Sequence, residues 1–129
     1  YFFNPIATQS SEANLIATNT AAASSSGTSA KTGFIVPASG TFTKLKLAAR
    51  VISGGGSTGN SNTTTITLFK NGQATSLSVQ VTVPVAVGSS GGAVATGSIA
   101  VNAGDVISYQ YTQTNQDPNT LFTVVLEGQ

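Results

Sequence analysis

The sequence predicts an all-β domain built as a sandwich of two antiparallel sheets. Apolar and polar residues alternate along most of the chain from Thr28 onward, and many of the apolar ones are β-branched, which is typical of half-buried strands. Gly, Asn and Pro residues separate the alternating segments, and no segment has the apolar period of a helix. With 129 residues, 40% of them hydrophobic, the chain is long enough for one domain with one core.

The predicted strands are short and follow one another without a helix between them. In the most regular one, Leu45, Leu47, Ala49 and Val51 fall on one face. The strands are expected at 14–18, 31–36, 41–52, 63–70, 75–83, 94–101, 105–114 and 121–127. Eight antiparallel strands in two sheets favour a jelly-roll sandwich. The expected core includes Leu47, Leu68, Val81, Ile107 and Val124.

Turn motifs support this division into strands. Asn71-Gly72 predicts a tight hairpin, because both residues tolerate the positive φ that such a turn needs. Asn102-Ala103-Gly104-Asp105 predicts a second turn, and Pro37 to Gly40 a third.

Residues 1–27 differ in composition from residues 28–129, and we expect them to form an extended arm attached to the jelly-roll domain. The apolar cluster at the start of the arm consists of Tyr1, Phe2, Phe3 and Ile6. Because large apolar side chains are costly to leave in water, we expect the arm to dock on another subunit rather than on its own domain. The alternative is a mobile chain end.

Charge is sparse, at 7% of residues with a formal net charge of +1. Lys44, Lys46 and Arg50 occupy alternate positions of one strand, so they form either its solvated side or a small anion-binding stripe. This basic field is small and lacks aromatic stacking platforms, so we expect no nucleic-acid binding. No segment approaches the roughly 18 apolar residues of a membrane span, so we expect no membrane insertion.

The residue types needed for most catalysis are missing. The chain has no His and no Cys, which excludes His-based triads, Cys nucleophiles and thiolate or imidazole metal sites. The best carboxylate pair is Asp105 with Asp117, but Asp105 is better explained as a turn residue. We therefore expect no enzyme and no cofactor.

One segment has the oxygen ligands of a calcium loop. Asn115, Asp117 and Asn119 alternate as the first ligands of such loops do. A single carboxylate is few for a divalent cation, and Asn, Asp and Pro also form ordinary turns. An ordinary loop is the favoured interpretation.

Three aromatic residues are candidates for contacts between subunits. Tyr109 and Tyr111 share a face with Ile107, which makes them core residues or part of a subunit seam. Phe69 alternates out of phase with Ile66 and is expected to point outward. It suits a contact with another subunit or, as a second choice, a platform for stacking a sugar.

Three stretches in this order resemble a known group of domains: Gly33 to Phe42, Thr65 to Gly72, and Val101 to Ser108. They are similar to the heads of the tumour-necrosis-factor and complement type found on phage fibres and on bacterial collagen-like or spore-surface filaments. They also look like jelly-roll decoration proteins of phage capsids. The resemblance implies a homotrimeric module for adhesion or assembly, extracellular or on a virion surface, and carries over no catalytic residue.

We therefore expect a structural module whose partners are copies of itself within a larger virion or appendage. One alternative is a filament subunit whose N-terminal strand adds to its neighbour's sheet. Another alternative is a carbohydrate-binding module that recognises cell-surface glycans.

Overall fold

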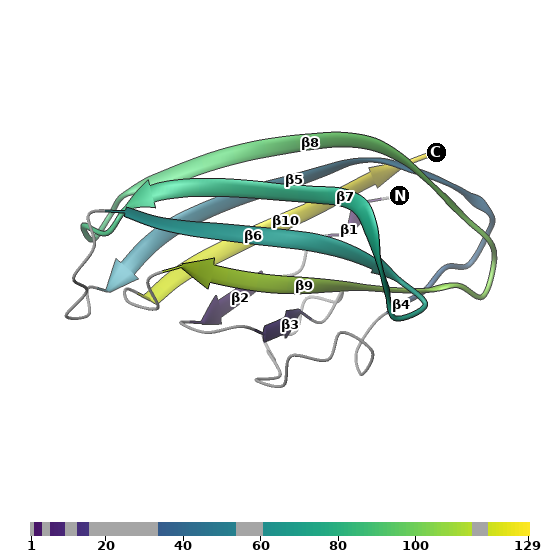
Figure 1. Ribbon diagram of the computed structural model, residues 1–129, viewed down its shortest axis with the longest axis horizontal. Coiled ribbons are helices and arrows are strands. Elements are labelled where there is room, and N and C mark those ends of the chain that lie inside the picture. The colour runs from purple at the N-terminus through teal and green to yellow at the C-terminus, as the bar shows by residue number, and fades with distance from the viewer. Residues whose placement is uncertain (1, 4–5, 10–12, 16–33, 54–60, 115–118) are drawn as a thin grey trace.

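The computed structural model describes residues 2–3, 6–9, 13–15, 34–53, 61–114 and 119–129, and every regular element in them is a strand (Figure 1). The strands pair antiparallel in two sheets, which confirms the all-β prediction. In chain order they are β1 (Phe2–Phe3), β2 (Ile6–Gln9), β3 (Ala13–Leu15), β4 (Phe34–Ile35), β5 (Gly40–Ser53), β6 (Ser61–Lys70), β7 (Gln73–Pro84), β8 (Ser90–Val101), β9 (Val106–Thr114) and β10 (Asn119–Gly128).

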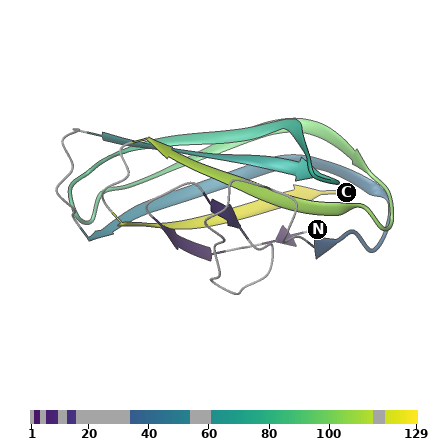
Figure 2. The ribbon, with the colours of Figure 1, turned by 60° about the horizontal axis from the view of Figure 1, so that its bottom comes forward.

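The two sheets face each other as the layers of a β-sandwich (Figures 1 and 2). Sheet A has the order β1-β10-β5-β8, with β2 also paired to β10. Sheet B has the order β3-β9-β6-β7, with β4 also paired to β9. Each of the eight predicted strands overlaps an observed one, and β1 and β2 were not predicted.

The core lies between the sheets and consists of the predicted inward faces. All five expected core residues are at most 6% exposed. Strict alternation continues along β7, where Leu77, Val79, Val81 and Val83 are buried and their neighbours exposed. Because the side-chain period of a strand is two, this agreement fixes which face of each strand points inward.

Turn chemistry accounts for the tight connections. Asn71 and Gly72 have φ values of 52° and 78°, so the predicted hairpin has the positive φ pair that Asn-Gly accepts. At the C-terminal end, a Cβ on Gly128 would lie 2.6 Å from the carbonyl oxygen of Thr41, so this close approach of β10 to β5 requires glycine.

The expected docking of the arm on another subunit is corrected for the described part of the arm. Phe2 and Phe3 pair with Glu127 and Leu126 of β10 in the same chain, and Ile6 pairs with Thr123. β3 pairs with β9 of sheet B. The unpaired backbone edges of β10 and β9 offer the hydrogen bonds that the arm needs. Tyr1 and the boundary after residue 27 lie outside the described residues.

One end of the interior is polar, which the sequence did not predict. Asn62 and Thr64 point inward from β6, and Thr120 from β10, all 0% exposed. The amide nitrogen of Asn62 donates to the Thr120 hydroxyl at 3.4 Å across the two sheets. Within the described residues, Asn62 Oδ1 and Thr64 Oγ1 have no hydrogen-bond partner.

Candidate functional site

The outer face of sheet A carries most of the described charges. Lys44, Lys46 and Arg50 share this face, as their alternate positions predicted. Glu127 of β10 lies opposite Lys44, whose Nζ is 3.7 Å from its carboxylate, and Lys46 donates a hydrogen bond to the same carboxylate. That hydrogen bond, together with the charge of both lysines, lowers the pKa of Glu127. Glu127 therefore offsets one of the two lysine charges, and the cluster keeps a net charge of +1.

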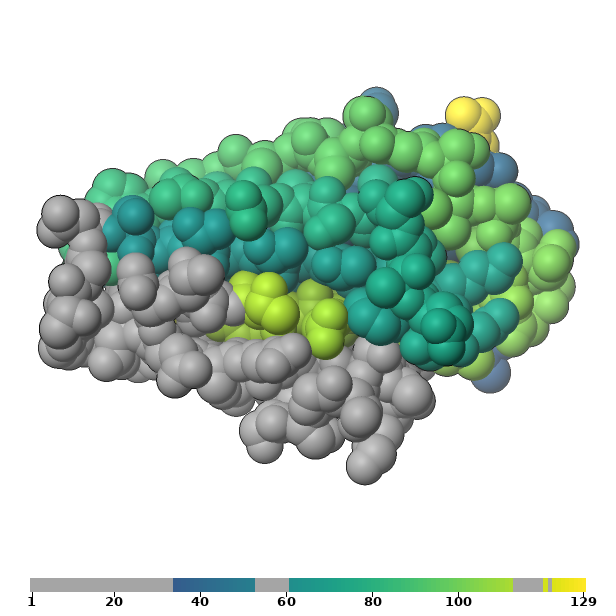
Figure 3. All heavy atoms as spheres, viewed as in Figure 1, coloured from purple at the N-terminus to yellow at the C-terminus, as the bar shows by residue number. Residues whose placement is uncertain are grey.

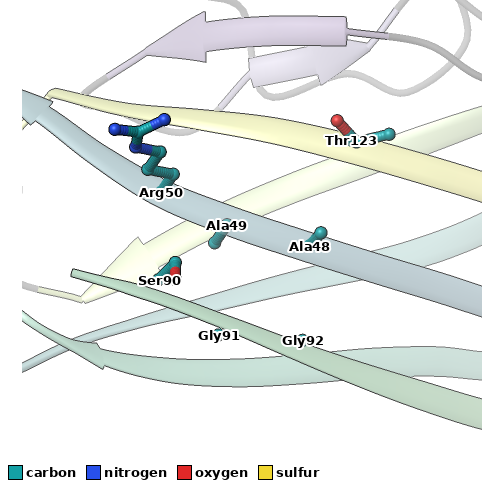
Figure 4. A pocket seen from close by; sticks show the side chains of 7 residues that line it. All are labelled: Ala48, Ala49, Arg50, Ser90, Gly91, Gly92 and Thr123. Atoms are coloured by element: carbon teal, nitrogen blue, oxygen red, sulfur yellow. The ribbon is translucent and has the colours of Figure 1, made fainter. Parts of the chain in front are cut away.

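Arg50 has a different environment. No ion pair to Arg50 is present among the described residues, whereas Lys44, Lys46 and Lys70 each lie beside a carboxylate. Arg50 borders a shallow basin of about 570 Å³ on the outer face of sheet A. The other lining residues are Ala48, Ala49, Ser90, Gly91, Gly92 and Thr123, shown in Figure 4.

The basin exists because small residues meet in register across three strands. Ala48 of β5 pairs with Thr123 of β10 on one side and with Gly92 of β8 on the other. The basin can accept a protruding side chain or a small anionic group beside Arg50, because its floor is low and its only charge is positive. None of its lining residues is aromatic or acidic.

Exposed apolar residues lie on the same face of sheet A. Val94 of β8 is 59% exposed and pairs with Lys46, in the row next to the basin. Ile52, near the end of β5, is 46% exposed. Together with the basin, these residues make the outer face of sheet A partly apolar and low in relief. We call this surface the sheet A face. It consists of the outward side chains of Lys44 to Ile52 in β5, Ser90 to Thr96 in β8 and Thr123 to Glu127 in β10.

The outer face of sheet B is uncharged along β6 and β7, and hydroxyl and amide side chains cover it. Thr63 and Thr82 are joined by a 2.8 Å hydrogen bond between their hydroxyls, and Thr67 and Ser78 by one of 3.0 Å. Gln80 donates to Thr65 at 3.0 Å. These cross-strand bonds satisfy the polar side chains locally, so this face offers few free donors to a ligand.

The two predicted turns meet in one hydrogen-bonded clasp. The side-chain amide of Asn71 donates to Asp105 Oδ1 at 2.8 Å, and its oxygen accepts from the Val106 N–H at 2.8 Å. Asp105 also accepts from the Asn102 N–H at 2.8 Å and lies 3.2 Å from Lys70 Nζ. The bonds from Asn102 and Asn71, in that order, lower the pKa of Asp105. Asp105 is thus a structural turn residue, as its sequence context favoured.

The aromatic candidates lie in different environments. Tyr109 and Tyr111 are 0% exposed inside the single chain, so the core alternative is the observed one. Tyr111 packs on Phe122 with ring centroids 4.7 Å apart. Burial raises the pKa of both tyrosines. Phe69 is half-buried beside Ser108, so it offers less apolar surface than an exposed ring would.

The possible calcium loop cannot be placed, because residues 115–118 and the side chain of Asn119 lie outside the described residues. Among the residues that are described, no group of three or more carboxylates stands close enough to hold a metal ion. The same described part of the chain contains no helix long and apolar enough to cross a membrane.

The sequence matches no family model and no curated protein. Among solved structures, it is similar to the Eiger TNF of S. frugiperda, with a TM-score of 0.38 and 7% identity. The match covers 72% of this chain and 63% of that one, so the chain spans less than two thirds of that protein's length. A TM-score this low carries no argument, and the fold assignment depends on the strand pairing described above.

Proposed function

We propose that the chain is a non-enzymatic assembly module, a jelly-roll subunit that forms trimers with copies of itself in a virion or extracellular appendage. The proposal combines a fold, a contact surface and a setting, and each has its own support.

The order of strands in the two sheets supports the jelly roll. If β1 and β2 count as one interrupted strand and β3 and β4 as another, sheet A contains the first, eighth, third and sixth strands. Sheet B then contains the second, seventh, fourth and fifth. Chains that alternate between sheets in this way wind as two Greek keys, which is the connectivity of an eight-stranded jelly roll.

The observation that carries the self-association is the sheet A face. Glu127 lies beside both lysines and reduces the positive charge that a second copy meets there. Ala48 and Gly92 allow close approach, and Val94 supplies apolar surface that gains free energy when it is covered. Closed symmetry limits such a contact to a defined oligomer.

The proposed location, outside the cell or on a virion, is inferred from the amino-acid composition. A surface solvated by hydroxyls and amides rather than by charges depends little on salt or pH, which suits an exposed location outside the cell or on a virion.

Light scattering on the purified full chain at tens of micromolar tests this proposal. We expect the mass of a trimer, three times the 12.9 kDa of the monomer, or a multiple of that mass. Ala48→Glu, at the centre of the sheet A face, should abolish the trimer, because it fills the basin with a large charged side chain in the contact. Thr65→Glu, on the opposite face, is the matched control and should leave the trimer intact. A monomeric wild-type chain would refute the proposal.

Adhesion to a glycan is the second candidate, and the basin is the observation that favours it. The basin is lined by the guanidinium group of Arg50 and by the hydroxyl groups of Ser90 and Thr123, a set that suits the carboxylate of an acidic sugar. This candidate requires the sheet A face to be open rather than covered by another copy. A glycan array should then select acidic glycans, and Arg50→Ala should abolish that selection while the chain remains folded.

A further inference from the structure

Two strand edges lie along the same side of the sandwich. β8 is the last strand of sheet A and β7 the last strand of sheet B, and the chain passes directly from one to the other. They run side by side along the upper margin of the molecule in Figures 1 and 3. Gly91 makes this approach close, because a Cβ there would lie 2.9 Å from Val83 Cγ1 and 3.2 Å from Val81 Cγ2.

Both edges have unused hydrogen-bonding capacity. Among the described residues, β7 pairs only with β6 and β8 only with β5. The pairing is regular over residues 78–84 of β7 and 90–96 of β8, and the register shifts fall outside these two stretches. In each stretch, alternate residues direct their N–H and C=O groups away from the sheet, which leaves roughly three or four such residues for another strand.

Within the part of the chain that the structure describes, these edges lack the features that normally prevent pairing between molecules. Edge strands are usually protected by charged side chains, by proline or by a covering segment. Residues 78–84 and 90–96 contain no charged residue, and the one proline, Pro84, stands at the end of β7. In β8 the side chains at 91–93 are Gly, Gly and Ala, so they do not hold a second backbone away.

We propose that residues 78–84 and 90–96 form a second contact, through which two copies of this chain join their sheets edge to edge. A two-fold axis normal to the sheets sets β8 antiparallel to the partner's β8 and β7 antiparallel to the partner's β7. Both sheets then continue across the interface.

A second copy suits this site better than a single foreign strand. A lone strand can pair with β7 or with β8 but not with both, because they belong to different sheets. Another copy presents two edges at the same spacing, and neither copy brings a charge that would repel the other.

The inference rests on the proposed function in one respect, namely that the chain associates with itself, but it uses the backbone edges of β7 and β8 rather than the outward side chains of the sheet A face. A chain with a three-fold contact on the sheet A face and a two-fold contact at the edge links trimers into a larger array. That is the behaviour expected of a subunit of a shell or appendage.

Matched charge variants distinguish the two contacts. Gln80→Glu puts a charge near the middle of the β7 edge, where the two-fold axis brings it close to its own copy. Thr65→Glu is the control for Gln80→Glu, since Thr65 is its register partner on the central strand β6. Ala48→Glu, on the central strand β5, disrupts the sheet A face and leaves the edges of β7 and β8 unchanged.

Sedimentation velocity over a hundredfold range of concentration provides the measurement, after circular dichroism has shown that each variant is folded. We expect the wild-type mass to grow beyond the trimer, Gln80→Glu to remain trimeric, and Thr65→Glu to grow as wild type does. Ala48→Glu should form dimers only. Amide exchange in residues 78–84 and 90–96 should slow as the wild-type concentration rises.

Any other result of the sedimentation experiment refutes either the trimer or the edge contact. A wild-type trimer that does not grow overturns the edge contact and leaves the proposed function standing. Wild-type dimers that Gln80→Glu dissociates overturn the trimer and retain the edge contact. Gln80→Glu and Thr65→Glu behaving alike also overturns the edge contact, because a charge anywhere on the outer face of sheet B would then have the same effect.

Discussion

Replacing Leu68 by alanine is the most direct test of the strand orientation on which these proposals depend. Leu68 is 0% exposed in the centre of β6. The substitution removes three carbon atoms from the core, a loss of about 2.4 kcal/mol at about 0.8 kcal/mol for each buried methylene. The cavity left behind adds to this, so we expect the free energy of unfolding to fall by about 3–4 kcal/mol in total. For a domain of this size, such a loss lowers the melting temperature by about 10–15 °C.

Thr67→Ala is the matched control, one residue away on the opposite face of the strand. Thr67 is half-buried, and its hydroxyl bonds to that of Ser78 at 3.0 Å, so its loss should cost about 1 kcal/mol or less. Urea unfolding of both variants should be compared at one low protein concentration, because association stabilises the folded state. If Thr67→Ala cost more than Leu68→Ala, β6 would be slipped by one residue and the sheet faces assigned here would be reversed.

Three further predictions concern pH, the clasp and close packing. The free energy of unfolding should be level from about pH 5 to 9, since the chain has no His or Cys, and denaturant titrations should show it falling on both sides. Below about pH 4 the free energy of unfolding falls, because folding lowers the pKa of Asp105 and of Glu127 and this stabilisation is lost when they are protonated. Above about pH 10 it falls again, because the buried tyrosines of β9 have raised pKa values in the folded chain and ionise on unfolding. Asn71→Gly should lower the thermal midpoint, because it loses two side-chain hydrogen bonds of the clasp. Asn71→Ala should lower it further, because alanine is strained at a φ of 52°. Equal midpoints for all three proteins would show that the clasp does not stabilise the fold. Gly128→Ala should lower the midpoint because its Cβ would lie 2.6 Å from a backbone oxygen, whereas Gly92→Ala, with its nearest contact at 3.4 Å, should leave it unchanged.

Contacts between site residues that are far apart in the chain could not be predicted from the sequence. The shared face of Lys44 and Lys46 followed from their spacing, but their pairing with Glu127 did not, because Lys46 and Glu127 are 81 residues apart. Likewise, the Asn71 and Asp105 turns were each predicted, while their union in one clasp was not. For Tyr109 the sequence left core and subunit seam as alternatives, and only its complete burial distinguished them.

By itself, the sequence determined the fold class, the strands from β5 to β10, their inward faces and the Asn71-Gly72 hairpin. These features are local, because the side-chain period of a strand and the φ preferences of turn residues act within a few positions of the chain. Tertiary structure alone decided the strand order in each sheet, the return of β1 to β3 onto their own domain, and the basin beside Arg50. It also decided that the uncharged strands β7 and β8 are the ones at the edges. Such features depend on which strands pair, and pairing is set by packing between segments far apart in the chain, which no local pattern records.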